Sequence, residues 1–460
     1  MTRFIGIVLS SLLLLTACTK DWQKSSTLPQ NRLIQVYFNH RQDNTGYTEP
    51  YRQRSRSGDN LESIIIEAIT AANSTIDLAV QELNLPLVAK ALAQSHRSGI
   101  KVRVILDNNY NRSLREFKTD EIARFTQRDR QKYRQLFQLV DVNQDNRLSP
   151  QEIAERDAIA MLRQAGIPVI DDTADGSKGS GLMHHKFMVV DGKTVVTGSA
   201  NFTLSGIHGD LDNPDTQGNV NHLLRIENER VAELFTAEFD YMWGDSSNGG
   251  INSKFGLAKP WRSPQTVFWK DTQITLQFAP TSSSQDWQNS TNGLINKTLK
   301  EASESIDLAL FVFSEQSIAN TLEQKQRERV TIRGVFDASF AYRYYSEVLD
   351  MLGITLYFRC QAEADNNPWQ NSISSVGTPQ IVRGDKLHHK FAIVDRASVI
   401  TGSQNWSEAA NHINDETLMA IDDPIVSQHF QREFERLYKS ASLGLTSNLK
   451  QKQQQQRQCS

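Results

Sequence analysis

The sequence predicts an α/β fold with two lobes, each an α/β/α sandwich built on a largely parallel or mixed sheet. The length of 460 residues leaves room for two or three domains, and 38% hydrophobic with 22% charged residues is typical of a globular protein. Strand-like runs alternate with helix-like runs, which favours helices packed on a sheet. The chain also repeats itself, so the two lobes are expected to be similar.

The internal repeat extends over a series of matching segments. Residues 74–80, STIDLAV, resemble residues 304–310, ESIDLAL, and both read as buried strands. Helix-like patterns precede them, at 61–72 in the first copy and at 294–302 in the second. The next helix and strand are 86–96 with 102–106 in the first copy, and 317–326 with 330–336 in the second. Further along, MHHKF at 183–187 corresponds to LHHKF at 387–391.

The first copy is longer than the second. Ile76 and Ile306 are 230 residues apart, whereas His184 and His388 are 204 residues apart, so the first copy holds 26 additional residues. The connection at 108–164 accounts for them, because its counterpart is only 338–352. An insertion is therefore expected at about 120–164. The segments expected in chain order are a leader (1–17), a first half (18–243), a linker rich in Gly, Ser, Asn and Pro (244–264), a second half (265–445) and a disordered Gln-rich tail (446–460).

The N-terminus has the composition of an export signal. Arg3 precedes an apolar run at 4–15, which is too short to span a bilayer comfortably, and Leu-Thr-Ala-Cys follows at 15–18. This sequence is similar to a bacterial lipobox, which implies that Cys18 receives lipid and anchors an exported protein to a membrane. The alternative is an ordinary signal peptide. Cys360 and Cys459 could form a disulfide, but two cysteines define no framework.

Both copies carry the same polar motif at identical spacing. Alternate residues of a strand face the same side, so the histidine and the lysine two positions later project together, while His185 and His389 point into the core. A turn at the aspartate returns the chain as a neighbouring strand, which brings serine and asparagine back towards the histidine. The motif residues are His184, Lys186, Asp191, Ser199 and Asn201 in the first copy, and His388, Lys390, Asp395, Ser403 and Asn405 in the second.

These groups suit a phosphate diester. Lysine, serine and asparagine can stabilise charge on the non-bridging oxygens of a five-coordinate phosphorus, and histidine titrates near neutrality. A lysine is almost never buried without a partner, so Lys186 within an apolar strand favours a functional site. Asp191 and Asp395 read as turn or scaffold residues.

The paired motifs resemble the signature of the phospholipase D superfamily, and the resemblance covers the chain from 18 onwards apart from the insertion. It implies one active site between the halves, in which one histidine forms a phosphohistidine and the other protonates the leaving alkoxide. His184 is assigned as the nucleophile and His388 as the general acid and base, although the symmetry makes the reverse almost as plausible. No catalytic metal is implied, because Lys186 and Lys390 stabilise the charge.

The two copies differ at the residue that orients the histidine. Members of the superfamily place a carboxylate downstream of each motif asparagine, and Glu416 occupies this position in the second copy. The first copy has Asn221 there, after an acidic loop. An amide can orient an imidazole without stabilising its cation as a carboxylate does. Either Asn221 or one of the loop aspartates (Asp210, Asp212, Asp215) is expected to hold a histidine.

The insertion contains a pattern typical of an EF-hand calcium loop. Oxygen-bearing side chains stand at positions one, three, five, nine and twelve, the residue at position seven offers its carbonyl, and Asn146 replaces the usual glycine at position six. Helices are expected at 130–140 and 150–162. The alternative is a polar helix–loop–helix with a capping box. The expected Ca²⁺ ligands, structural or regulatory, are Asp141, Asn143, Asp145, Arg147, Ser149 and Glu152.

These observations predict a phosphodiesterase that hydrolyses phospholipids at a membrane surface and works as a monomer with internal pseudo-twofold symmetry. The net charge of −3 disfavours bulk nucleic acid, since non-specific binders of nucleic acid usually carry a basic surface. A secreted nuclease is the main alternative, because such motifs recognise the phosphate rather than the groups attached to it. A third reading is a non-catalytic, calcium-dependent surface-binding module, which the two intact motifs disfavour.

Overall fold

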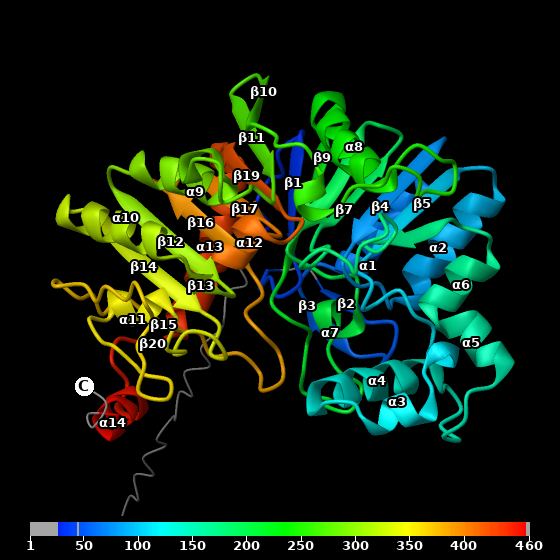
Figure 1. Ribbon diagram of the computed structural model, residues 1–460, viewed down its shortest axis with the longest axis horizontal. Coiled ribbons are helices and arrows are strands. Elements are labelled where there is room, and N and C mark those ends of the chain that lie inside the picture. Colours follow the sequence, from blue (N-terminus) through cyan, green and yellow to red (C-terminus); the bar gives the residue numbers. More distant parts are fainter. Residues whose placement is uncertain (1–25, 44–45, 457–460) are drawn as a thin grey trace, which may run out of the picture.

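The computed structural model describes residues 26–43 and 46–456, which form two lobes side by side (Figure 1). Each lobe has a sheet with helices packed on it, so the expected α/β class and two-lobed architecture are confirmed. Within this part of the chain, no helix has the length and apolar composition needed to cross a bilayer. The leader, Cys18 and Cys459 lie outside the described residues. Cys360 is disulfide-bonded.

The first lobe is built on a seven-stranded mixed sheet. In sheet order its strands are β1 (Ile34–Phe38), β9 (His222–Glu227), β8 (Thr194–Gly198), β7 (Lys186–Val190), β4 (Thr75–Val80), β5 (Lys101–Leu106) and β6 (Val169–Asp171). Strands β4, β5 and β6 are parallel, whereas β7, β8, β9 and β1 add antiparallel pairs. A small hairpin joins β2 (Gly46–Thr48) to β3 (Ser55–Ser57).

The second lobe repeats the centre of this sheet. In order, its nine strands are β10 (Gln265–Trp269), β11 (Thr272–Phe278), β19 (Thr417–Asp422), β17 (Ser398–Gly402), β16 (Lys390–Val394), β12 (Ser305–Leu310), β14 (Thr331–Phe336), β15 (Val376–Thr378) and β20 (Ser442–Leu443). The run β19-β17-β16-β12-β14 corresponds to β9-β8-β7-β4-β5, so the sequence repeat is also a structural repeat. Two short strands, β13 (Phe313–Ser314) and β18 (Trp406–Ser407), pair separately.

Helices cover the sheets of both lobes. The first lobe contains α1 (Leu61–Thr70), α2 (Pro86–Arg97), α6 (Ala158–Gln164), α7 (Leu204–Ile207) and α8 (Glu229–Trp243), with the 3₁₀ turn η1 (Leu114–Glu116). The second contains α9 (Thr291–Lys300), α10 (Gln316–Arg327), α11 (Glu347–Met351), α12 (Glu408–His412) and α13 (Pro424–Lys439). The turn η2 (Gly256–Ala258) lies between the lobes in the sequence, and η3 (Trp287–Asn289) lies between β11 and α9 of the second lobe.

The insertion forms α3 (Thr119–Ala123), α4 (Gln127–Val140) and α5 (Pro150–Arg156), which lie beneath the first lobe in Figure 1. The helix expected over 150–162 is divided into α5 and α6. The division falls at Asp157, whose carboxylate accepts hydrogen bonds from the backbone of Leu114 (2.7 Å) and Ala160 (3.1 Å). Asp157 caps α6 and also holds η1, so a break at this residue is more stable than a continuous helix would be.

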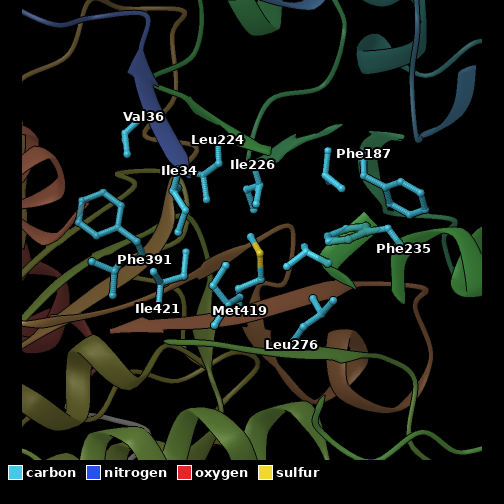
Figure 2. Packing of buried hydrophobic residues seen from close by; sticks show 14 of the residues in the cluster. Ile34, Val36, Phe187, Leu224, Ile226, Phe235, Leu276, Phe391, Met419 and Ile421 are labelled. Atoms are coloured by element: carbon cyan, nitrogen blue, oxygen red, sulfur yellow. The ribbon is translucent and has the colours of Figure 1, made fainter. Parts of the chain in front are cut away.

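One hydrophobic core joins the lobes. Figure 2 shows Leu224 and Phe235 of the first lobe facing Leu276 and Met419 of the second, with Ile34 of β1 beside them. Helices α8 and α13 both contribute to this cluster, whereas α1 and α2 pack in a separate core of the first lobe and α9 and α10 in one of the second. The shared core fixes the two sheets relative to each other, which a site between the lobes requires.

The prediction of a disordered tail is wrong for residues up to 456. Helix α14 (Ser447–Gln455) begins at Thr446, whose side chain accepts a hydrogen bond from the Leu449 N–H group, and the Leu449 side chain is buried. The side-chain amide of Gln456 also pairs with the backbone of Tyr357. These contacts outweigh the polar composition that favoured disorder.

The motif aspartates organise turns, as predicted. Asp191 and Asp395 follow β7 and β16 in the left-handed conformation, with φ of 54° and 49°. Each carboxylate accepts hydrogen bonds from three consecutive backbone N–H groups at the start of β4 or β12; those to Asp395 come from residues 303–305, each at 2.8 Å. Although partial burial opposes it, these donors hold the pKa of Asp395 below its usual range.

We predict that Asp395→Asn lowers the free energy of unfolding by about 2 kcal/mol at neutral pH, because an amide accepts these bonds without a charge. The depressed pKa contributes stability above the pKa of the unfolded state, and this stability is lost as the pH falls through the folded-state pKa. Urea denaturation of the variant and the wild type should therefore differ near pH 7, and the difference should shrink at an acidic pH below the pKa of the unfolded state. Asp215→Asn, at an exposed carboxylate, is the control. An equal loss at both pH values would contradict this role.

Candidate active site

The two motif histidines lie just before equivalent strands, where each lobe pairs with the other. The His184 N–H donates to the Asp415 carbonyl at 3.0 Å, and the His388 N–H donates to the Val220 carbonyl at 3.0 Å. The adjacent residues form parallel bridges, Met183 with Asp415 and Val220 with Leu387. The backbone of each motif is thus held by the opposite half of the chain.

The His184 side chain is oriented by a carboxylate of the second lobe. Its Nδ1 lies 2.7 Å from Oε2 of Glu416, which also accepts a hydrogen bond from Ser403 Oγ at 2.6 Å. Burial raises the pKa of Glu416 to about 7, against the influence of Lys186. A carboxylate on Nδ1 directs the other ring nitrogen, Nε2, towards the reacting group and stabilises positive charge on the ring.

The His388 side chain is oriented by an amide of the first lobe. Its Nδ1 lies 3.0 Å from Oδ1 of Asn221 and 3.1 Å from the Ser199 carbonyl. Ser199 Oγ donates to the same Asn221 oxygen at 2.8 Å, as Ser403 does to Glu416. Between the two alternatives that the sequence left open, Asn221 rather than a loop aspartate contacts the imidazole. The orienting residues are therefore exchanged between the halves, which the repeat alone did not reveal.

The motif lysines are buried and each donates to the carbonyl of its own histidine. Lys186 Nζ lies 2.7 Å from the His184 carbonyl, and Lys390 Nζ lies 2.7 Å from that of His388. Burial lowers the pKa of Lys186 to about 7 and also lowers that of Lys390, in the latter case with the help of Lys186. Incompletely paired buried ammonium groups are costly, so a bound anion would relieve this cost.

The charged groups of each motif affect the pKa values of the histidine in the other motif. Burial lowers the pKa of both histidines well below its ordinary value, and Lys186 and Lys390 each lower it further at both rings. His184 also lowers the pKa of His388. The two motifs therefore lie in one electrostatic environment that favours negative charge, which is the property needed by a phosphate site.

Asn201 and Asn405 retain free hydrogen-bonding capacity. Both residues are partly exposed, and their Oδ1 atoms are buried without a hydrogen-bond partner among the described residues. Asp191 and Asp395, by contrast, lie at the far ends of β7 and β16 from the lysines and belong to the scaffold.

His185 and His389 lie on the opposite strand face, as predicted. His185 Nε2 is 3.2 Å from Glu238 of α8, and His389 Nε2 is 3.1 Å from Glu433 of α13. Both rings are fully buried among aromatic side chains in the core shared by the lobes. They brace the motif strands against these helices rather than face the site.

The residues that flank the lysines were not predicted from the sequence. Lys186 Nζ is 3.4 Å from Oε1 of Gln81, whereas Lys390 Nζ lies 4.8 Å from the ring centroid of Phe311, the corresponding residue of the second copy. The centroids of Phe311 and His388 are 4.7 Å apart. Both residues directly follow the repeated strands at 74–80 and 304–310, so the repeat alignment was the only signal available for them.

The segment expected as a linker also helps to hold the backbone next to His184 in place. Lys259 is fully buried and forms ion pairs with Glu238 and, at 2.6 Å, with Asp415. The Gly256 N–H group donates to Asp415 as well, at 2.9 Å. Asp415 presents its backbone carbonyl to His184, so the connection between the halves braces the backbone behind this histidine.

The candidate calcium loop closes on itself through its acidic side chains. Asp141 accepts hydrogen bonds from the backbone of Asp145 (3.2 Å) and Asn146 (3.0 Å), and Asn146 has the positive φ, 60°, expected at position six. Glu152 accepts hydrogen bonds from Ser149 and from the backbone of Val142 at 3.1 Å. Among the described residues, no group of three or more His, Cys, Asp or Glu side chains is arranged to hold a metal ion. Calcium would therefore require Glu152 to exchange these bonds for the ion.

Comparison with known proteins places this geometry in a family. A family model described as "Cardiolipin synthase, PLD-like domain" matches residues 65–243 and 295–438. Mitochondrial cardiolipin hydrolase of Xenopus laevis is 30% identical over 141 residues, which cover 30% of this chain and 56% of the relative. Phospholipase D of Rickettsia prowazekii is 25% identical over 171 residues, which cover 37% of this chain and 57% of the relative.

The matched segments thus span little more than half of these relatives. The crystal structure of phosphatidylserine synthase from Haemophilus influenzae shares the fold, with a TM-score of 0.55 at 12% identity, over 90% of this chain and 88% of that one. The family model covers more than half of the sequence and both motif-bearing halves. This chain therefore belongs to the family of cardiolipin synthase-type, phospholipase D-like domains.

Proposed function

We propose that this chain is a phosphodiesterase of the phospholipase D type that hydrolyses phospholipids through a phosphohistidine intermediate. The observation that carries the proposal is the exchanged pairing of the imidazoles, His184 with Glu416 and His388 with Asn221. Each pairing engages Nδ1 and leaves Nε2 for the reaction. Two imidazoles prepared in this way, with two ammonium groups, supply a nucleophile, a proton donor and charge stabilisation without a metal.

The different partners favour His184 as the nucleophile. An imidazole that attacks phosphorus becomes positively charged, and the Glu416 carboxylate stabilises that charge. Asn221 fixes the ring of His388 but does not stabilise its cation, so protonated His388 gives up its proton more readily. The asymmetry between carboxylate and amide thus supports His184 as the nucleophile and His388 as the general acid and base.

The reaction then proceeds in two balanced steps. His184 Nε2 attacks phosphorus, the bond from phosphorus to the leaving oxygen breaks, and His388 gives its proton to that oxygen. A water molecule next attacks the phosphohistidine, His388 takes a proton from the water, and the bond from phosphorus to His184 breaks. Lys186, Lys390, Asn201 and Asn405 would stabilise the equatorial oxygens in both steps.

A phospholipid substrate is supported by the names of the relatives, cardiolipin hydrolase and phospholipase D. The proposal includes export and a lipid anchor at Cys18, which would place the site beside a membrane. Fractionation of the producing cells tests this location, and recovery of the protein from the soluble cytoplasm would reject it. The proposed monomer follows from the internal pair of motifs, which completes the site within one chain.

We predict that His388→Ala traps the covalent intermediate, whereas His184→Ala forms none. With bis(p-nitrophenyl) phosphate the leaving group needs little protonation, so the first step survives loss of the acid while the second lacks its base. The His388→Ala variant should release about one equivalent of nitrophenol in a burst and lose about a hundredfold or more in steady-state turnover. Mass spectrometry of the quenched protein should locate the added phosphoryl group on His184. Adduct formation on His388 in the His184→Ala variant would reverse the assignment.

Burial raises the pKa of Glu416 to about 7. We therefore expect kcat/KM to rise as the pH increases through about 7. Below this pH the protonated carboxyl no longer stabilises the charge on His184, and above it the carboxylate does. In Glu416→Gln, the fall of kcat/KM on the acidic side of the pH profile (the acidic limb) should disappear. The maximal rate should fall by about 10²-fold or more. Asn221→Asp is the reciprocal variant and should retain an acidic limb. An unchanged acidic limb in Glu416→Gln would contradict the role of Glu416.

Calcium binding by the 141–152 loop remains part of the proposal, with a structural or regulatory role. The left-handed Asn146, the buried Asp141 and the loop closure support it, although Glu152 must turn towards the ion. The bound ion would fix the end of α4 relative to α5.

We predict that calorimetric titration of the full-length protein with calcium chloride detects one site, with a Kd in about the 10⁻⁵–10⁻³ M range for an unpaired loop. Glu152→Gln should weaken this binding by about tenfold or more, whereas Glu155→Gln, an exposed carboxylate on the same helix, should not. Absence of heat for the wild type at millimolar metal, or equal binding by both variants, would remove the site.

A further inference from the structure

The insertion creates a cavity in the first lobe beside the motif lysine. The cavity has a volume of about 480 Å³, within the usual range for small-ligand sites. Its walls come from the loops that follow β4 and β5, from α4, and from the start of α6. The second lobe has no counterpart of α4, because the corresponding connection at 338–352 is short. The cavity is therefore a feature of one half only.

Two lining residues connect the cavity to the catalytic motif. Gln81 lines it and lies 3.4 Å from Lys186 Nζ. Leu182 also lines it and precedes His184 by two residues, with its carbonyl accepting the Asp415 N–H bond at 2.9 Å. A phosphodiester held at His184 would therefore have one substituent directed past Lys186 and Gln81 towards this space.

One part of the wall is apolar and aromatic. The rings of Phe117, Phe125 and Tyr133 form an edge-to-face cluster with centroids 5.5–5.8 Å apart, and none of the three is fully buried. Leu83, Leu136 and Ile159 complete the apolar surface. Such a surface favours hydrocarbon, because its contact with water is lost on binding.

The charges around the cavity do not suit a polyanion. Its lining includes three cations, Arg112, Arg128 and Lys132, but four carboxylates. Arg112 forms a double hydrogen bond with Glu121, and Lys132 lies 3.4 Å from Glu82 and donates to Tyr110 at 2.6 Å. A nucleic acid strand with its phosphate at His184 would place further phosphates near this net negative lining, which disfavours it.

We propose that this cavity is a substrate subsite that holds the glycerol and the adjoining acyl carbons of a phospholipid whose phosphate lies between His184 and His388. The assignment rests on the proposed function and narrows its substrate class from phosphodiesters to diacylglycerol-containing lipids. It also gives the insertion a role in the reaction, because α4 carries Lys132, Tyr133 and Leu136 and ends where the candidate calcium loop begins.

A variant that fills the cavity tests this subsite. Leu136→Trp places a larger side chain in the cavity, and Gln131→Trp puts the same side chain on an exposed position of α4 that does not line it. We expect Leu136→Trp to lower the ratio of kcat/KM for dioctanoyl phosphatidylglycerol to that for bis(p-nitrophenyl) phosphate by about tenfold, and Gln131→Trp to leave it at the wild-type value. An unchanged ratio in Leu136→Trp, whether both rates persist or both fall, would overturn the assignment.

Binding separates failure of the subsite from failure of the proposed activity. In a His388→Ala background, where turnover is expected to be about a hundredfold or more slower, calorimetric titration with dioctanoyl phosphatidylglycerol should give a Kd about tenfold weaker when Leu136→Trp is added. If the wild type hydrolyses neither substrate but this shift is present, the activity is wrong and the subsite stands. If the wild type cleaves single-stranded DNA and Leu136→Trp lowers that rate selectively, the occupant is a nucleic acid and the lipid subsite is rejected.

Discussion

The structure depends on the exchange of backbone and side-chain partners between the two halves. The backbone of His184 is held by Asp415, its ring is held by Glu416, and the equivalent bonds to His388 come from Val220 and Asn221. Neither half on its own orients its motif histidine, His184 or His388. The shared hydrophobic core is therefore a condition for the chemistry as well as for stability, because a shift of one sheet against the other would separate each histidine from its partner.

The pseudo-symmetry of this framework makes its departures informative. Ser199 and Ser403 each donate to the residue that holds a histidine, yet that residue is an amide in one half and a carboxylate in the other. The lysines differ in a similar way, with Gln81 beside Lys186 and Phe311 beside Lys390. Duplication would yield two equal sites, so the differences show where the halves have been specialised. The surroundings of the two lysines therefore differ. Gln81 and the cavity formed by the insertion lie beside Lys186, whereas the ring of Phe311 lies beside Lys390.

The sequence allowed the repeat, the fold class and the motif strands to be predicted, because strand alternation and spacing are local properties. The partners of His184 and His388 could not be derived in that way, since the residue spacing is the same whether a half completes its own site or its neighbour's. The β1 strand at 34–38 pairs with β9 as β11 pairs with β19, but it lies before the repeated segments recognised in the sequence and was not anticipated. One helix was predicted over 150–162, as the helix that leaves the candidate calcium loop. Asp157 divides it, because its carboxylate caps α6 at Ala160 and also accepts a hydrogen bond from the distant Ser113.

The segment between the halves was the least informative in sequence and has a defined place in the structure. Its Gly, Ser, Asn and Pro content favoured a passive linker, but Lys259 is buried between Glu238 and Asp415. Burying an ammonium group is unfavourable unless its partners are held in place, and here Arg262 and His185 also contact Glu238. Burial opposes ionisation of Glu238, yet Lys259 and Arg262 hold its pKa below the usual range. Such a network fixes one arrangement of the connection, and because Asp415 belongs to it, that arrangement also determines where the backbone of His184 lies.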